Sequence, residues 1–240
     1  MALFKRMLPA YLLALTAALG LSVAISQAVT GRAAMQTISE EYAAPIIVVD
    51  PGHGGEDGGA VAPSGTKEST RNLEISLRLR DLLCFLGCSV RMTRETDVSV
   101  YSPEAVTVSE KKVSDLKNRV RAVNETPGAI LLSIHQNMFS EARYRGAQVF
   151  YTASERNKAL AECLQGVLGR NLDPDNHRQA KQTDTVYLLN QVNCPAALVE
   201  CGFLSNPQEE LLLGTADYQI KLAAAIAAGL TQAINDAAPS

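Results

Sequence analysis

Short β-branched runs alternate with longer segments of helical periodicity between residues 45 and 235, and this alternation restricts the fold more than any other feature. Residues 45–50 and 129–134 are nearly continuous apolar runs, as expected for strands that are buried on both faces. Residues 72–86 carry leucines at helical spacing. Strands and helices that alternate in this way form a mostly parallel, twisted sheet with helices on both faces. We therefore expect one α/β domain with a sheet of about six strands.

The remaining elements follow from the same periodicities. We expect strands at 89–93, 147–152, 186–189 and 196–199, and helices at 115–125, from 155 to about 169, after Pro207 and from about 218 to 235. Ser154 is a favourable N-cap for the helix that follows it, and Pro207 suits the first position of its helix. The polar segment 97–113 is expected to be a surface loop or an insertion.

The first 29 residues differ from the rest of the chain. Lys5 and Arg6 precede an apolar stretch over residues 7–29, and about 20 apolar residues suffice to cross a bilayer as a helix. The positive end stays inside, so the remainder would lie outside the cytoplasm. The small residues around Ala28 would also suit cleavage of a signal peptide. We expect an exported protein with a signal peptide or membrane anchor at 1–29, a linker at 30–44 and a catalytic domain at 45–240.

Charge and cysteine usage exclude some classes of protein. The net charge is −3 and the basic residues are scattered, which argues against a nucleic-acid partner. The number of cysteines is odd and no CxxC pair occurs, which argues against a complete disulfide framework and against a cysteine zinc site. We expect most cysteines to be small buried apolar residues, with Cys84 and Cys88 on one face of a helix. The five are Cys84, Cys88, Cys163, Cys194 and Cys201.

Two of the three histidines come directly after predicted strands. His53 follows the strand at 45–50, and His135 follows the strand at 129–134. Open parallel sheets place their sites at the carboxyl ends of the strands, so both imidazoles are expected in one crevice. Glu200 follows the strand at 196–199 and is expected there as well. His177 lies in a polar stretch and does not follow a predicted strand, so we interpret it as a loop residue.

Glu68 completes a set of residues suited to a metal ion. The glycine-rich loop 52–65 precedes it and is flexible enough to bring its carboxylate beside His53. Two neutral imidazoles and a carboxylate suit a catalytic Zn²⁺, which lowers the pKa of bound water to about 7 and polarises a carbonyl. A second carboxylate must then carry the proton of the water to the departing amine. Glu200 is the candidate for this role.

Each of these residues also has a purely structural interpretation. A histidine after a strand can simply hydrogen-bond a loop, and Glu68 can favour a helix start through the helix dipole. Glu200 can pair with an arginine. A carboxylate that follows an apolar strand is nevertheless costly to bury unless it is paired, bound to a metal or used chemically. The combination of the four residues therefore favours a metal-dependent hydrolytic site.

Four separated motifs follow one another along the chain: Val49-Asp50-Pro51-Gly52-His53-Gly54-Gly55, Glu68, Ser133-Ile134-His135-Gln136-Asn137 and Val199-Glu200-Cys201-Gly202-Phe203-Leu204-Ser205-Asn206. In these motifs the chain resembles the zinc-dependent N-acetylmuramoyl-L-alanine amidases of the type-3 fold, over Ile46–Ile234. The resemblance implies that His53, Glu68 and His135 hold zinc and that Glu200 is catalytic. Residues 145–151, 178–181 and 187–189 are most similar to the germination-specific amidases of spore formers. Those enzymes strip peptide from muramic acid in spore-cortex peptidoglycan, so that muramic δ-lactam can form.

Further residues are candidates for contact with the substrate. Arg71 follows Glu68 and either contacts substrate or supports the helix start. Gln136 stands where the family often has alanine and is expected to border the cleft together with Asn137. Arg145 could bind a substrate carboxylate through its fork of donors, or could be a solvated surface residue.

Three functional hypotheses remain open at this point. The first is an amidase that cuts between the lactyl group of muramic acid and L-alanine, and the second is a zinc peptidase that trims wall peptides. The third is a membrane-tethered wall-binding protein with a degenerate site, which the presence of all four candidate residues disfavours. Peptidoglycan is the expected partner, an activating protein is a further one, and the membrane is a third if the N-terminal segment is not removed.

Overall fold

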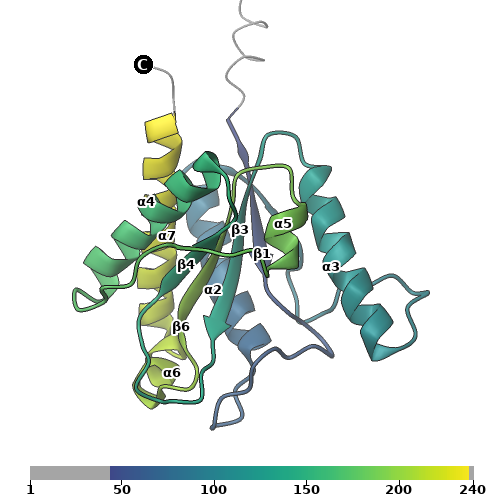
Figure 1. The fold of residues 1–240 in the computed structure, drawn as a ribbon, viewed down its shortest axis with the longest axis horizontal. Coiled ribbons are helices and arrows are strands. Elements are labelled where there is room, and N and C mark those ends of the chain that lie inside the picture. The colour runs from purple at the N-terminus through teal and green to yellow at the C-terminus, as the bar shows by residue number, and fades with distance from the viewer. Residues whose placement is uncertain (1–43, 238–240) are drawn as a thin grey trace, which may run out of the picture. The chain divides into compact units, whose positions relative to one another are not determined.

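A computed structural model describes residues 44–237, which form one six-stranded sheet with helices on both faces (Figure 1). The strand order is β2-β1-β3-β6-β4-β5, and every neighbouring pair is parallel except β4 with β6. The predicted fold class is thus confirmed. The strands are β1 (Ile46–Pro51), β2 (Ser89–Met92), β3 (Ala129–Asn137), β4 (Gln148–Tyr151), β5 (Lys181–Gln182) and β6 (Ala196–Phe203).

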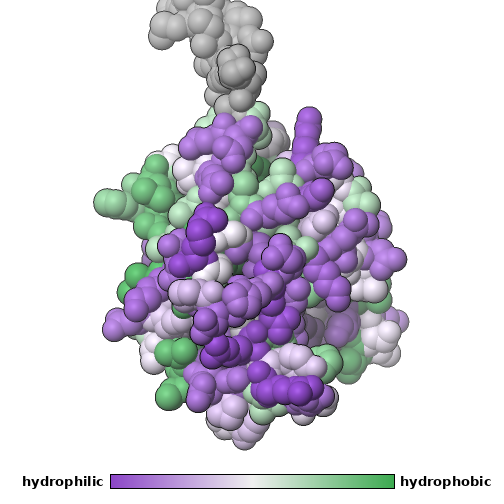
Figure 2. Space-filling model, turned by 60° about the vertical axis from the view of Figure 1, so that its left-hand side comes forward, coloured by the Kyte–Doolittle hydropathy of each residue, from purple (hydrophilic) through white to green (hydrophobic). Residues whose placement is uncertain are grey.

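The helices form one layer on each face of the sheet. On one face, α2 (Glu68–Phe85), α4 (Glu155–Leu172) and α7 (Ala216–Ala237) enclose the larger apolar core. On the other face, α3 (Val108–Asn124) and α5 (Tyr187–Gln191) cover a smaller one. The short helix α6 (Pro207–Leu213) follows β6. Hydrophilic residues cover most of the outer surface drawn in Figure 2.

Strand β1 shows why the central strands are apolar on both faces. Ile47 and Val49 belong to the core under α2, α4 and α7, whereas Val48 belongs to the core under α3 and α5. Successive side chains of a strand point to opposite faces, so a strand between two helical layers must be apolar at every position. The predicted caps are also confirmed, because Ser154 accepts from the backbone of α4 and Pro207 occupies the first turn of α6.

Two predicted elements were wrong. Residues 186–189 do not form a strand: Val186 is the N-cap of helix α5, because a four-residue apolar run fits either periodicity. The loop predicted at 97–113 ends earlier, since α3 begins at Val108 rather than near Asp115. Thr107 and Glu110 form a capping box that starts this helix. The short exposed edge strand β5 was not predicted.

The cysteines are less buried than expected. All five are free, and only Cys201 is fully buried. Cys84 is exposed near the end of α2, and Cys88 lies beyond that helix rather than on it, because the helix ends at Phe85.

The leader predicted at 1–29 and the linker up to residue 43 lie outside the described residues. Within residues 44–237, no single helix is long and apolar enough to cross a membrane. Helices α6 and α7 meet the length and composition requirement only as a pair that is bent by 84°.

Candidate metal centre

His53 occupies a left-handed backbone conformation directly after β1. Its φ is 60°, and it is the one non-glycine residue with a positive φ in the part of the chain that the structure describes. Such a conformation costs on the order of 1–3 kcal/mol and persists only where the surroundings impose it. Two glycines make room for the site: a Cβ on Gly52 would lie 2.2 Å from the His135 ring, and a Cβ on Gly59 would lie 2.6 Å from Oε2 of Glu68.

Arg94 fixes the backbone on both sides of this turn. Its Nε donates to the carbonyl of Pro51 at 2.9 Å, and its Nη2 donates to the carbonyls of Gly52 at 3.0 Å and Ser69 at 2.9 Å. One buried guanidinium therefore joins the segment that carries His53 to the start of α2, where Glu68 lies. Burial lowers the pKa of Arg94 to about 10, and the neighbouring Arg119 adds to this effect.

Arg119 of α3 holds the same turn from the other face of the sheet. It donates to the carbonyls of Pro51 at 2.9 Å and His53 at 2.7 Å. Its charge is balanced by Asp50 at 2.6 Å and Asp115 at 2.5 Å. Because Arg119 and Asp50 are both almost completely buried, removing either one would leave an uncompensated charge.

Asp50 also connects β1 to β3. Its carboxylate accepts hydrogen bonds from Thr93 at 2.6 Å and from Ser133 at 2.7 Å. Burial acts to raise the pKa of Asp50, but Arg119 and these hydrogen bonds outweigh it and hold the pKa at about 2. Ser133 is thus an anchor of the strand that carries His135.

Glu68 lies between the two imidazoles. Its Oε2 is 3.3 Å from Nε2 of His53, and its Oε1 is 2.9 Å from Nδ1 of His135. One ligand atom from each of these three residues lies within 4.8 Å of the others, so together they could hold a metal ion. The other nitrogen of His53, Nδ1, is 3.1 Å from Oδ2 of Asp57. A carboxylate on the second ring nitrogen is the usual way in which a metal-binding histidine is oriented.

The Glu68 carboxylate is buried and accepts several hydrogen bonds. The backbone N–H groups of Ala60 and Gln136 donate to it at 2.9 and 3.2 Å, and the Asn72 side chain donates at 3.2 Å. Burial opposes its ionisation, but the hydrogen bonds and charges of the two imidazoles hold its pKa well below the usual range. Glu68 is therefore a fixed negative charge at the centre of the site.

Glu200 lies beside this cluster on the neighbouring strand. The structure pairs it directly with His135 across β3 and β6, so both side chains lie on the face covered by α3 and α5. Both residues were predicted to follow their strands but lie inside them, because β3 and β6 run several residues further. Oε2 of Glu200 is shielded from solvent and has no hydrogen-bond partner in the described part of the protein. Burial raises the pKa of Glu200 to about 7, with Glu68 adding to the shift.

A cavity of about 300 Å³ opens over the two histidines on this same face. Its walls come from the glycine-rich loop, from α3 and from the start of α5, where Tyr187 is exposed. A molecule in this cavity would contact His53 and His135 directly.

The remaining candidate residues are dispersed. Arg71 forms an ion pair with Glu74 at 2.7 Å, and its guanidinium would contact a Cβ placed on Gly214. Gln136 is buried and donates to Asn72, so it does not border the cavity.

Arg145 is half exposed and lies 3.7 Å from Asp173 and 3.6 Å from Asp175. Asn137 accepts a backbone hydrogen bond from Leu204 at the end of β3. His177 lies in the loop before β5, away from the other histidines, as the sequence suggested.

The supporting residues Asp57, Arg94 and Arg119 were not identified from the sequence. Asp57 could have been proposed as a partner of His53, because it lies only four residues after it in the glycine-rich loop. The two arginines had none, since nothing in a sequence pairs them with carbonyl groups far along the chain.

Comparison with known proteins gives consistent results. The model of the Amidase_3 family, described as N-acetylmuramoyl-L-alanine amidase, matches residues 47–232. The germination-specific N-acetylmuramoyl-L-alanine amidase of Bacillus subtilis is 41% identical over 186 residues, which are 77% of this chain and 78% of that protein.

Solved structures agree with these matches. The CwlD amidase of Clostridioides difficile, determined in complex with the GerS lipoprotein, is similar with a TM-score of 0.78 and 40% identity, covering 80% of this chain and 99% of that one. An N-acetylmuramoyl-L-alanine amidase from Clostridium difficile 630 has a TM-score of 0.71 and 26% identity, covering 81% and 99%. The chain therefore belongs to the Amidase_3 family of N-acetylmuramoyl-L-alanine amidases.

Proposed function

We propose that this amidase depends on zinc, with His53, Glu68 and His135 as the ligands and Glu200 as the group that transfers protons. The observation that carries the proposal is the position of Glu200: an unpartnered, shielded carboxylate oxygen adjoins a cluster of three ligand atoms within 4.8 Å of one another. A purely structural carboxylate at this depth would be expected to have a hydrogen-bond partner.

The residues present fit a zinc ion. Two imidazole nitrogens and one carboxylate oxygen are a usual ligand set of catalytic zinc, which keeps a further position open. The Glu68 charge is stabilised by the two imidazoles, and Asp57 orients His53. Zinc in such a site supplies Lewis acidity and lowers the pKa of water to about 7.

The protein side chains transfer the proton, line the substrate cavity and hold the His53 turn. The ionised Glu200 accepts a proton from the attacking water at its free Oε2 and transfers it to the nitrogen of L-alanine as the amide bond breaks. His53 and His135 line the cavity that receives the lactyl carbonyl. Arg94 and Arg119 keep the His53 turn in its strained conformation throughout.

The physiological substrate in this proposal is spore-cortex peptidoglycan, from which the enzyme would remove peptide so that muramic δ-lactam can form. Its support is the 41% identity to a germination-specific amidase over 77% of the chain. The substrate lies outside the cytoplasm, in agreement with the leader expected at 1–29 ahead of a catalytic domain at 45–240. The solved complex of the similar CwlD amidase with the GerS lipoprotein supports a protein partner. The location in this proposal, the outer face of the cytoplasmic membrane or the forespore intermembrane space, follows from the leader expected at 1–29.

Incubation of the purified protein with peptidoglycan tests the proposal. We expect peptides that begin with L-alanine to be released, release to stop with a chelator and to return when zinc is added back. Fragments that begin at another residue would instead indicate a zinc peptidase. Activity that survives complete removal of metal would disprove the zinc proposal. Comparison of cortex with vegetative peptidoglycan then tests the choice of substrate.

A further inference from the structure

A row of polar side chains extends from the histidines across the sheet. His135 on β3 pairs with Glu200 on β6, and Glu200 in turn pairs with Gln148 on β4. Residues directly opposite one another on neighbouring strands lie on the same face, so the three side chains follow one another across the sheet. Gln148 shares its face with Phe150, which packs against the core under α3 and α5. The row therefore runs from the catalytic group toward the edge of the sheet.

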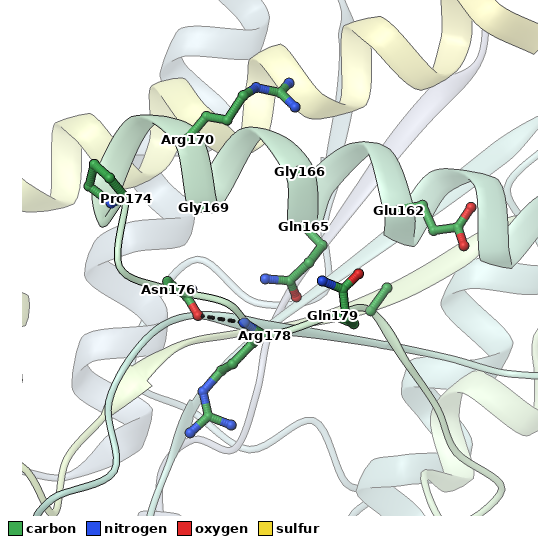
Figure 3. Close-up of a pocket in the computed structure, with 10 residues that line it drawn as sticks. Glu162, Gln165, Gly166, Gly169, Arg170, Pro174, Asn176, Arg178 and Gln179 are labelled. Atoms are coloured by element: carbon green, nitrogen blue, oxygen red, sulfur yellow. Dashed lines mark hydrogen bonds between the residues drawn. The ribbon is translucent and has the colours of Figure 1, made fainter.

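Arg178 lies next to the end of this row. Its Nη1 donates to Oε1 of Gln148 at 3.0 Å, and its Nε donates to the carbonyl of Arg145 at 2.8 Å. The guanidinium also stacks over the Phe203 ring, 4.7 Å from its centroid. Figure 3 shows the side chain pointing away from α4, on the opposite side of the loop from Arg170. Three contacts therefore hold the guanidinium in one orientation.

The positive charge of Arg178 acts on the Glu209 carboxylate without forming an ion pair with it. Across residues 44–237 no carboxylate forms an ion pair with Arg178, and its Nη2 makes no hydrogen bond. The other arginines near the site differ in this respect. Arg119 is balanced by two aspartates, and Arg145 lies close to two others. Arg178 is thus held in one orientation, and its Nη2 is available to donate to a ligand.

We propose that Arg178, held in place by the Gln148 side chain, forms a subsite for a carboxylate of the peptide that leaves muramic acid. The inference rests on the proposed role of Glu200. Since Glu200 protonates the departing nitrogen, the peptide must extend from Glu200 and not from His53, and the row leads from Glu200 to Arg178. The ligand class is an acidic peptide, bound through a charge-assisted hydrogen bond.

The dimensions agree with the second residue of the peptide. Neighbouring strands are about 4.8 Å apart, so Gln148 lies one strand spacing from Glu200 and Arg178 lies beyond it. Two residues of an extended peptide span about 7 Å. A free carboxylate on the residue after L-alanine would therefore reach the Arg178 guanidinium while the L-alanine nitrogen is beside Glu200.

Two small substrates that differ only in this charge test the subsite. Both compounds are N-acetylmuramoyl-L-alanyl-D-isoglutamyl derivatives whose γ-carboxyl is capped as a methylamide, as the next residue caps it in a longer peptide. One carries a free α-carboxylate on the residue after L-alanine, and the other carries an α-amide at the same position. We expect the zinc-loaded full chain to bind the acid about 10-fold to 100-fold more tightly than the amide in calorimetry, as a charge-assisted hydrogen bond implies. The ratio of kcat/KM values should favour the acid in the same direction.

Variants of Arg178 make the test specific. Arg178→Gln should bring the ratio of acid to amide close to one, and Arg178→Lys should restore part of it because the charge remains. Arg170→Gln is the matched control: this arginine belongs to α4 and points away from Arg178, so the ratio should not change. Thermal melting of each variant checks that the fold is intact.

The outcomes separate this inference from the proposed function. Equal binding of acid and amide by the wild type, or a preference that survives in Arg178→Gln, would overturn the subsite. Preferential binding of the acid without hydrolysis of either compound would support the subsite and count against the proposed chemistry.

Discussion

His135 and Glu200 lie directly opposite one another in the parallel pair formed by β3 and β6. Side chains in this relation have Cβ atoms about 5 Å apart, so an imidazole that could bind a metal and a carboxylate that could move a proton are neighbours by register alone. A shift of one residue between the two strands would send one of them to the opposite face. On its other side, β3 is held to β1 by Ser133, which donates to Asp50 directly opposite it.

Glu200→Gln should separate chemistry from metal binding. The substitution keeps the size of the side chain but removes the base, so hydrolysis should fall by about 10²-fold to 10⁴-fold. Zinc content by elemental analysis should stay at the wild-type level, since Glu200 is not one of the three clustered ligands. Glu155→Gln, at the exposed start of α4, serves as the control and should retain full activity. Wild-type turnover by the Glu200 variant would disprove the mechanism.

The same substitution should stabilise the metal-free protein at high pH. The pKa of Glu200 is raised from 4.5 to about 7, so between these values the folded state holds a proton that the unfolded state has released. Unfolding free energy should therefore fall as the pH rises through this window and level off above it. Each pKa unit corresponds to about 1.36 kcal/mol, so Glu200→Gln should gain roughly 3 kcal/mol at pH 8 and nothing at pH 4. Urea unfolding with chelator present measures the gain in unfolding free energy at each pH. Equal gains at pH 4 and pH 8 would refute the raised pKa of Glu200.

Asp57→Asn should weaken metal binding without abolishing it. The carboxylate of Asp57 orients His53 through Nδ1, and loss of such a partner lowers metal affinity by about 10-fold to 100-fold. His53→Ala, which removes the ligand itself, should lower zinc occupancy much further. Competition with a chromogenic chelator measures the affinities. If the Asp57 variant binds zinc as tightly as the wild type, the carboxylate has no part in the site.

The sequence was sufficient to predict the convergence of the site. His135 and Glu200 lie in strands of plainly apolar character and His53 directly follows another, and parallel strands bring their carboxyl ends to one edge of the sheet. Glu68 was proposed because the glycine-rich loop before it could bring its carboxylate beside His53, and the family resemblance implied the same ligand. The exact positions inside β3 and β6 were not predictable, because both strands continue beyond their apolar runs into polar residues.

Features that depend on contacts between distant residues could not be read from the sequence. Val186 and the three residues after it fit a strand as well as a helix. They form the start of α5 because Leu188 and Leu189 pack in the core under α3. The contacts of Arg94 with the carbonyl groups of Gly52 and Ser69 join segments that are 42 and 25 residues away. An arginine that follows a glutamate by three or four residues on a helix can be recognised from the spacing of the two residues. An arginine that donates to backbone carbonyl groups has no such spacing in the sequence.

Arg94→Lys should lower zinc affinity more than its effect on folding would explain. A lysine ammonium has three donors at one point, whereas the Arg94 guanidinium spans the carbonyls of Pro51, Gly52 and Ser69. At least one buried carbonyl should lose its donor, at a cost of about 1–3 kcal/mol in unfolding free energy. The His53 turn would then relax from its left-handed conformation, and the ligand atoms would no longer converge.

A matched control distinguishes this effect from general destabilisation. Gln165 of α4 is also buried, and its side-chain hydrogen bonds go to the backbone of Val149 and Ala147 and not to the segments that carry the three ligands. Gln165→Met should therefore cost a similar amount of unfolding free energy and leave zinc affinity unchanged. Metal titration and urea unfolding of both variants give the comparison. If the two variants lose zinc affinity equally, the role of Arg94 is only structural; if Arg94→Lys alone loses it, the guanidinium holds the ligands in position, because the fold itself is weakened to the same extent in both.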